Sequence, residues 1–307
     1  MRRIIERILA SVLMGALLLG LSGCKSNNRQ ESSLGTEILP KTTATDMSSG
    51  EDTAAATATI EATTAAATAP AVNMPEMDPI TEPTAIRDIF PDEAFATAIC
   101  EQVGKDSIDD LVTQTDLDTV SIIVATGANI TSIVGIGHLK NLGSLDLYDN
   151  PLISLPKEIG YLTSLYHLCL SYTQLTSLPP EIGNLTSLLE LVLNENQLTG
   201  LPPEMGNLTS LGSLFLGSNQ MTSLPVEIGN LSSLTILSLN NNQLTSLPVE
   251  ICNLSALTDL DLENNQIANL PSEIGNMTSL KMLILTGNLN ISIPDSITGN
   301  PNIKVVN

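Results

Sequence analysis

Leucine and isoleucine recur along the second half of the chain in a pattern that repeats every 23 residues. Seven consecutive units follow one another from Leu142 to Asn302, and the third reads LLELVLNENQLTGLPPEMGNLTS. A fixed period of this size indicates a solenoid, in which each unit forms one coil and stacks on the next. A divergent unit begins 22 residues earlier, at Val120, so we predict a repeat domain over residues 120–307.

Each unit opens with an alternation of apolar and variable residues that predicts a short strand. In the second unit Leu168 and Leu170 flank Cys169, so the leucines face the core and Cys169 faces outward. Strands that recur in every coil stack about 4.8 Å apart into a parallel sheet. An Asn follows the strand and can satisfy backbone groups in the turn, except in the coils that carry Ala128 or Thr173 there, which we expect to be less tightly bonded.

The repeated L-x-x-L-x-L-x-x-N-x-L segment resembles the leucine-rich repeat family, in the 23-residue subclass that carries L-P-x-E-I-G-N-L. The resemblance covers roughly residues 120–307. It implies an α/β solenoid shaped like a horseshoe, with a parallel β-sheet on the concave face. It also implies that the protein recognises another macromolecule.

A solenoid needs caps, because a terminal coil has one uncovered apolar side. Residues 85–119 begin with AIRDIFPDEAFATAIC and predict a small cap of two short helices, the first ending at Gly104. Phe-Pro-Asp followed by such a helix resembles the N-terminal cap of internalin-like surface proteins. At the other end, the closing IKVVN predicts one further strand and no cap helix.

The first 23 residues have the organisation of an export signal. Three arginines precede an apolar run from Leu9 to Leu21, which is shorter than the roughly 20 residues of a spanning helix. The run ends in Leu-Ser-Gly-Cys, which resembles the lipobox of bacterial lipoproteins. That resemblance implies cleavage before Cys24 and a diacylglyceryl group on its thiol, so that the exported protein is anchored facing outward, on the outer membrane in a Gram-negative host. The alternatives are an uncleaved anchor helix or an ordinary signal peptide.

Residues 24–84 are rich in Thr, Ala, Ser, Pro and acidic residues and show no apolar periodicity. Such a segment cannot bury enough surface to offset the entropy of ordering. We therefore predict a disordered tether between the lipid and the cap.

Composition and charge narrow the functional classes. The chain is 42% hydrophobic but 2% aromatic, which suits coils filled by aliphatic side chains in register. Its formal net charge of −21 argues against nucleic acid as a partner and against attraction to anionic lipid. Attachment to a membrane must then come from Cys24.

The outward strand positions are the candidate site, because the repeat does not fix them. They include two tyrosines on adjacent coils, an apolar stripe and an acidic cluster: Tyr148 and Tyr172; Val192, Phe215 and Ile236; Asp259, Asp261 and Glu263. Exposed apolar residues rimmed by acid are typical of a partner site. We predict non-catalytic binding of a protein or glycan by this face. The acids could instead hold Ca²⁺, although alternate strand residues lie rather far apart for its several oxygen ligands, which favours a solvated acidic rim.

Nothing in the sequence predicts catalysis, a cofactor or a metal. Neither His138 nor His167 has a nucleophile at a fixed spacing, and signal, tether, cap and repeats leave no residues for an enzyme domain. Cys169 and Cys252 lie three coils apart on different faces and cannot form a disulfide. Two alternatives remain: a self-associating structural protein of the envelope, and a hydrolase that uses the acidic cluster.

Overall fold

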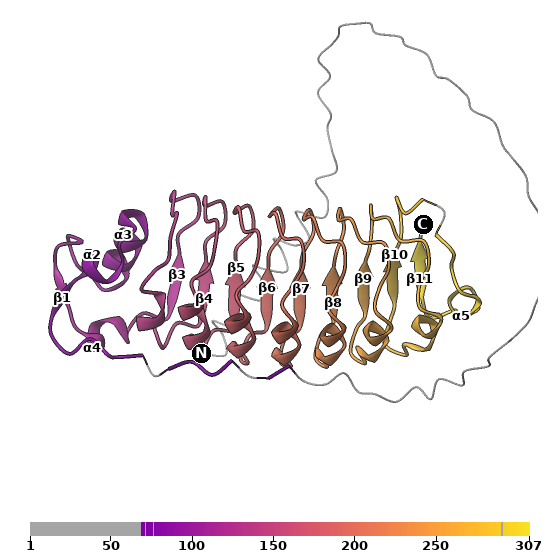
Figure 1. Cartoon of the computed structure of the whole chain (residues 1–307), viewed down its shortest axis with the longest axis horizontal. Coiled ribbons are helices and arrows are strands. Elements are labelled where there is room, and N and C mark those ends of the chain that lie inside the picture. The colour runs from indigo at the N-terminus through magenta and orange to yellow at the C-terminus, as the bar shows by residue number, and fades with distance from the viewer. Residues whose placement is uncertain (1–68, 71, 76, 290) are drawn as a thin grey trace, which may run out of the picture. The chain divides into compact units, whose positions relative to one another are not determined.

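The computed structural model describes residues 69–307 except 71, 76 and 290. These residues form a solenoid with a small cap at its N-terminal end (Figure 1). The predicted signal, Cys24 and most of the predicted tether lie outside the described residues. Among the described residues, no helix is long and apolar enough to cross a membrane.

One parallel sheet of nine strands runs the length of the solenoid, in the order β11 to β3 with sequential neighbours paired throughout. This confirms the predicted fold class. The strands are β3 (Ile122–Val124), β4 (Ser144–Asp146), β5 (His167–Cys169), β6 (Glu190–Val192), β7 (Ser213–Phe215), β8 (Ile236–Ser238), β9 (Asp259–Asp261), β10 (Met282–Ile284) and β11 (Lys304–Val306).

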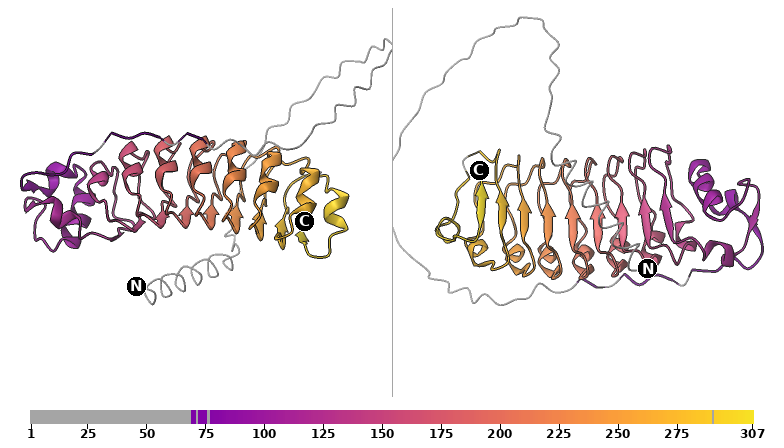
Figure 2. Two further views of the ribbon diagram at one scale, coloured as in Figure 1. Left: turned by 90° about the horizontal axis from the view of Figure 1, so that it is seen from below. Right: turned by 180° about the vertical axis from the view of Figure 1, so that it is seen from behind.

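Short 3-10 helices line the opposite side of the coils, where the prolines begin each return arm (Figure 2). They are η1 (Ile136–His138), η2 (Lys157–Tyr161), η3 (Pro180–Asn184), η4 (Pro203–Asn207), η5 (Val226–Asn230), η6 (Val249–Asn253) and η7 (Ser272–Asn276). We call this side the helical face and the strand side the sheet face. The seventh regular coil carries a four-residue α-helix in the same place, α5 (Asp295–Thr298), and β11 then pairs with β10 as expected.

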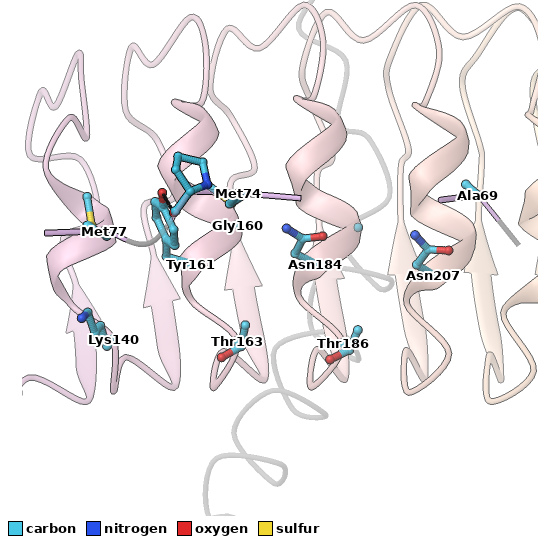
Figure 3. A pocket seen from close by; sticks show the side chains of 12 residues that line it. Ala69, Met74, Met77, Lys140, Gly160, Tyr161, Thr163, Asn184, Thr186 and Asn207 are labelled. Carbon is cyan, nitrogen blue, oxygen red and sulfur yellow. Dashed lines mark hydrogen bonds between the residues drawn. The ribbon is translucent and has the colours of Figure 1, made fainter. Parts of the chain in front are cut away.

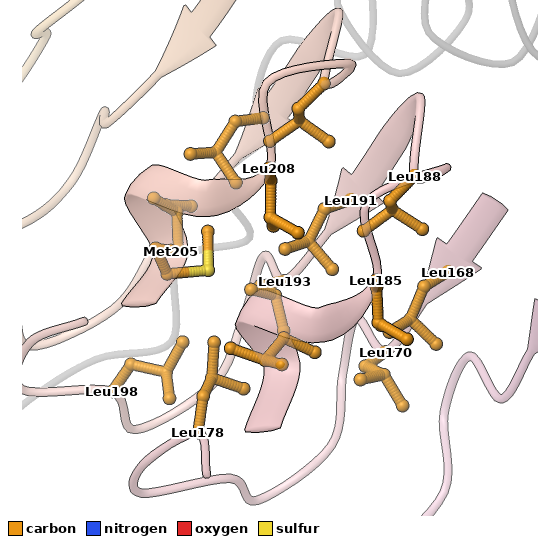
Figure 4. Close-up of a cluster of buried hydrophobic side chains, with 14 of the residues drawn as sticks. Leu168, Leu170, Leu178, Leu185, Leu188, Leu191, Leu193, Leu198, Met205 and Leu208 are labelled. Carbon is orange, nitrogen blue, oxygen red and sulfur yellow. The ribbon is translucent and has the colours of Figure 1, made fainter. Parts of the chain in front are cut away.

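Aliphatic side chains fill the space between the two faces (Figure 4). Leu191 and Leu193 flank Val192 on β6, and both leucines are fully buried, as the alternation predicts. Phe90 and Phe95 belong to the buried core, and they meet in the cap with ring centroids 5.5 Å apart. The scarcity of aromatic residues therefore matches a core made of stacked leucine and isoleucine.

A ladder of buried asparagines joins successive coils. Asn219 shows the pattern: its Oδ1 accepts from the Leu198 N–H at 3.0 Å, and its Nδ2 donates to the carbonyls of Leu193 and Leu216 at 2.9 and 3.0 Å. Thr173 takes the Asn place in the second coil. Its hydroxyl donates to Leu170 O and to Asn196, and no side-chain hydrogen bond joins it to a described residue of the preceding coil. The weaker bonding predicted at Thr173 therefore lies between the second coil and the coil before it.

The glycines of the return arm are explained by the closeness of neighbouring coils. A Cβ on Gly183, Gly206 or Gly229 would lie 2.3–2.6 Å from the carbonyl oxygen of a glutamate in the next coil. None of the three has a positive φ, as Cys252 in the equivalent place suggested. The position therefore selects glycine for close backbone approach rather than for a left-handed conformation.

The cap contains a two-stranded antiparallel sheet and three short helices. These are β1 (Thr84–Ala85), β2 (Leu111–Val112), α2 (Ile86–Ile89), α3 (Glu93–Gln102) and α4 (Gln114–Leu117), so the cap has one helix more than predicted. Asp92 joins the cap to the first coil. Its carboxylate caps α3 through the Phe95 N–H at 2.9 Å and also accepts from Thr131 and Ser132.

The predicted boundary at residue 84 falls inside β1, and the chain just before it is not separate from the solenoid. Val72 accepts a hydrogen bond from Asn184, and Pro75 accepts one from Tyr161, both on the helical face. The last residues expected to belong to a free tether therefore contact the repeat domain.

Candidate functional site

The register of the sheet arranges the outward side chains of the sheet face in two columns. The first contains Ile122, Ser144, His167, Glu190, Ser213, Ile236, Asp259, Met282 and Lys304. The second contains Val124, Asp146, Cys169, Val192, Phe215, Ser238, Asp261, Ile284 and Val306. Side chains directly opposite in neighbouring strands touch, so each column forms a continuous surface.

The predicted apolar stripe lies in the middle of this face but bends from one column to the other. Val192 pairs with Phe215, and Cys169 precedes them in the same column. Ile236 lies in the first column, opposite Ser213 and diagonal to Phe215. All four side chains are half-buried, so the patch is a shallow apolar surface that spans the four adjacent strands β5 to β8.

The acidic residues adjoin this patch rather than gathering into one site. Asp259 pairs with Ile236, and Asp261 pairs with Ser238 and Ile284. Burial raises the pKa of the Asp261 carboxyl, against the lowering effect of the hydrogen bond it accepts from the Glu263 N–H at 3.0 Å. In the described part of the chain, no group of three or more His, Cys, Asp and Glu side chains is arranged to hold a metal ion.

The two predicted tyrosines form a pair where the second and third strands of the sheet end. The ring centroids of Tyr148 and Tyr172 are 5.1 Å apart with an interplanar angle of 52°, and Tyr172 is 49% exposed. Tyr172 has a φ of +56°, a left-handed conformation that is unusual for a bulky residue. Its N–H donates to the Asn194 carbonyl at 3.0 Å, which holds this backbone in place. Strain at an exposed aromatic side chain favours a functional role.

The left-handed conformation belongs to this place in every coil, and the side chain is what differs. Asp149, Glu195, Ser218, Asn241 and Asn264 occupy it with φ between 53° and 58°. Small polar residues tolerate the conformation better than tyrosine does. The repeat therefore imposes the backbone, and the second coil uses it to present an aromatic ring.

Sequence reasoning missed a side-chain hydrogen-bond contact on the sheet face. His167 Nδ1 lies 2.9 Å from Glu190 Oε2 across adjacent strands, and both side chains are largely covered. The signal was available, because residues 23 apart occupy neighbouring places in one column. It also missed Ile122 and Val124, which are 36% and 65% exposed on β3, because they belong to the divergent first coil.

The environments of Cys169, Cys252 and His138 do not favour reactivity. Burial raises the pKa of the Cys169 thiol to about 12, with a further contribution from Asp146, and burial likewise raises the pKa of Cys252 to about 12. A protonated thiol is a weak nucleophile. Burial lowers the pKa of His138, which favours its neutral form. Among the described residues, Cys100, Cys169 and Cys252 are free thiols.

Comparison with known families decides the classification. A family model described as "Leucine-rich repeat region" matches residues 117–218 and 213–298, which together exceed half of the chain. The chain belongs to the leucine-rich repeat family. The internalin model, described as "Bacterial adhesion/invasion protein N terminal", matches residues 74–118, so the cap of this leucine-rich repeat protein is internalin-like, as its Phe-Pro-Asp motif suggested.

Individual relatives agree with this classification. The chain is 48% identical to Internalin H of Listeria monocytogenes over 73 residues and 36% identical to Internalin C of that species over 72 residues. Each match covers 24% of this chain, and the chain spans 13% and 24% of these curated relatives. The crystal structure of internalin C2 from Listeria monocytogenes superposes with a TM-score of 0.64 at 30% identity, over 75% of this chain and 99% of that chain.

A more distant likeness concerns a receptor with its ligand bound. The plant peptide hormone receptor RGFR1, solved in complex with RGF2, matches with a TM-score of 0.57 at 32% identity. The match covers 64% of this chain and 32% of that chain. This chain and a plant receptor thus share the repeat architecture.

Proposed function

We propose that this protein is an exported bacterial lipoprotein whose sheet face binds a protein partner outside the cell, without catalysis. The observation that carries the proposal is the apolar patch of Val192, Phe215 and Ile236, flanked by the tyrosine pair and by acidic residues on an otherwise regular scaffold. Interfaces typically combine an apolar centre with a polar rim. The internalin-like cap, together with the adhesion and invasion named in that family's description, supports a protein over a glycan as partner.

The charges of the face suggest what the partner presents. Asp259, Asp261 and Glu263 lie on one side of the patch, and Asp146 lies on the other. We expect a partner whose contact surface is apolar at its centre and basic at its edges, since complementary potentials speed association and exclude wrong partners.

Anchoring is tested by metabolic labelling. Cells that express the full chain should incorporate a palmitate analogue into the protein, and Cys24→Ala should abolish the label and release the protein from the membrane. Cys100→Ala is the matched control and should change neither. A labelled, membrane-bound Cys24→Ala protein would contradict the lipobox assignment.

Binding is tested on arrays of extracellular proteins and of glycans, probed with the purified exported chain. We expect saturable binding to a protein with a basic surface. Saturable binding to a glycan alone would change the partner class, and signal from the protein itself alone would favour the structural alternative. That second candidate has one supporting observation: β11 ends the sheet order with no strand beyond it among the described residues, and open strand edges can pair.

A further inference from the structure

An extended segment before the cap runs across the helical face (Figures 2 and 3). We call residues 72–80, except residue 76, the strap. The surrounding sequence contains Pro70, Pro75, Pro79 and Pro83, which favour an extended backbone and lack N–H donors. The strap has no regular secondary structure, so side chains of the solenoid must hold it in place.

The strap and the coils share a common spacing. Met77 lies against Gly137, and Met74, three residues earlier, lies against Gly160 in the next coil. A Cβ on Gly137 would lie 2.7 Å from the Met77 sulfur, and one on Gly160 would lie 2.6 Å from the Met74 sulfur. Each thioether therefore occupies room that an alanine would remove. For Gly137 the nearest atoms are Met77 and the Tyr161 ring, so the strap, rather than the backbone of another coil, accounts for this glycine.

Polar groups fix the strap between and beside these contacts. The Tyr161 hydroxyl donates to the Pro75 carbonyl, and the Asn184 amide donates to the Val72 carbonyl at 3.0 Å. At the cap end, the Ile80 N–H donates to the Gln114 side chain at 3.5 Å. Gln114 also donates to the His138 carbonyl at 2.8 Å, so it joins strap, cap and first coil. Successive coils thus hold the strap from Ile80 back to Val72.

We propose that the helical face is a binding groove for this strap, and that the strap makes the N-terminal tether leave the solenoid opposite the sheet face. With the strap seated, the chain passes Asn184 and reaches the next coil at Asn207, where Ala69 lies. With the strap released, it would depart from β1 at the cap end, and the freed residues would add about 40 Å of extended chain. Resting on the anchoring at Cys24 proposed above, the seated strap directs the sheet face away from the membrane.

The position of the strap is measurable in the exported chain without any lipid. Spin labels at Asn73→Cys and Thr209→Cys, with the native cysteines replaced by alanine, report the distance between strap and helical face. We expect a narrow distance distribution in the otherwise native chain. Met74→Asp with Met77→Asp should broaden it and shift it to longer distances, because two carboxylates cannot occupy the glycine contacts.

Two further variants keep the test falsifiable. Pro79→Asp with Thr81→Asp adds the same charge at exposed positions of this segment and should leave the distribution narrow. Tyr161→Phe with Asn184→Ala removes only the two solenoid donors to the strap and should broaden the distribution, while the far-ultraviolet spectrum and melting temperature show the domain folded. A broad distance distribution in the otherwise native chain would contradict the proposal that the strap is held on the helical face. A narrow distribution in the Met74→Asp/Met77→Asp chain would contradict the role of the two methionines in holding it.

Orientation is tested separately on vesicles that carry the lipidated chain. Energy transfer to a lipid dye should be stronger from a fluorophore at Ser187, after η3, than from one at Asn240, after β8. The Met74→Asp/Met77→Asp pair should remove this difference, and equal transfer in the native chain would overturn the orientation. Failure of the chain to bind vesicles would instead contradict the anchoring, while the distance measurement would still decide the strap.

Discussion

The interior and the sheet face of this protein differ in how strictly their residues repeat, although these residues alternate along the same strands. Inside, the regular coils place leucine, isoleucine or an occasional methionine at equivalent core positions, and an asparagine closes the turn in all but the second coil. Outside, Cys169, Val192, Phe215 and Ser238 follow one another in a single column. The repeat therefore specifies a scaffold and leaves the outward positions of the sheet face free to vary.

The largest expected effect comes from a fixed interior position. Asn219→Ala should lower the free energy of unfolding by at least about 3 kcal/mol, because several buried backbone groups lose their partner and each costs about 1–3 kcal/mol. Gln220→Ala, at the exposed neighbour, should change it by less than about 0.5 kcal/mol. Chemical denaturation measures both free energies of unfolding, and similar values for the two variants would contradict a structural role for the buried asparagine.

A smaller effect is expected where coils meet on the helical face. Gly206→Ala places a Cβ 2.6 Å from the Glu227 carbonyl oxygen and should destabilise the domain by about 2 kcal/mol. Gly200 has no atom within 4 Å of such a Cβ, so Gly200→Ala should be neutral or slightly stabilising. Thermal unfolding of the two variants compares them, and equal melting temperatures would refute the close-approach explanation.

Removing charges from the sheet face should change the rate of partner binding and leave the stability of the fold unchanged. Asp259→Asn with Asp261→Asn should slow association with the partner several-fold and reduce its dependence on salt, because the acidic rim attracts a basic surface. Glu181→Gln with Glu204→Gln removes the same charge from the helical face and should have little effect. Stopped-flow association at two ionic strengths distinguishes them, and a faster rate in the first variant would exclude a basic partner.

The smallest expected effect concerns the junction between cap and coils. Burial would raise the pKa of Asp92, but its hydrogen bonds to Thr131, Phe95 and Ser132 outweigh this and lower it. A lowered carboxyl pKa gives stability that is present above the ordinary value and lost as the pH falls through the folded value. Hydrogen exchange of α3 should therefore accelerate below about pH 4.

Asp92→Asn should show part of that acceleration already at neutral pH, because an amide has one acceptor oxygen and cannot accept from both Phe95 and the Thr131–Ser132 backbone, a loss of about 1 kcal/mol. Asp88→Asn, on the exposed side of α2, provides the control and should behave like the native chain. An exchange rate of α3 that is independent of pH in the native protein would show that Asp92 does not secure the cap.

Much of the fold was predictable because each coil repeats the same pattern of apolar and polar positions. The leucines around Cys169 predict strand, core and register together, since neighbouring coils must align every 23 residues. The outward direction of Phe215 and Tyr172 follows from the same alternation. The left-handed backbone of Tyr172 was not evident from the sequence, because the residue that adopts this conformation differs from coil to coil although the conformation itself recurs.

The strap was not predictable from local pattern. Val72 and Pro75 meet partners 112 and 86 residues away, and the composition of their segment resembles that of a disordered chain. Its methionines carry no periodicity that could be matched to glycines on the solenoid. In the same way, the pairing of His167 with Glu190 depends on side-chain reach as well as on strand position.

The central claim is that the sheet face, and not the helical face, binds the partner. The most direct measurement is the dissociation constant of the double variant Phe215→Asp/Tyr172→Ala beside that of Val226→Asp/Val249→Asp, which alters exposed apolar residues of the helical face. We expect at least about a tenfold loss of affinity in the first and native affinity in the second, with both proteins folded. Unchanged affinity in the first variant, with a loss in the second, would contradict it.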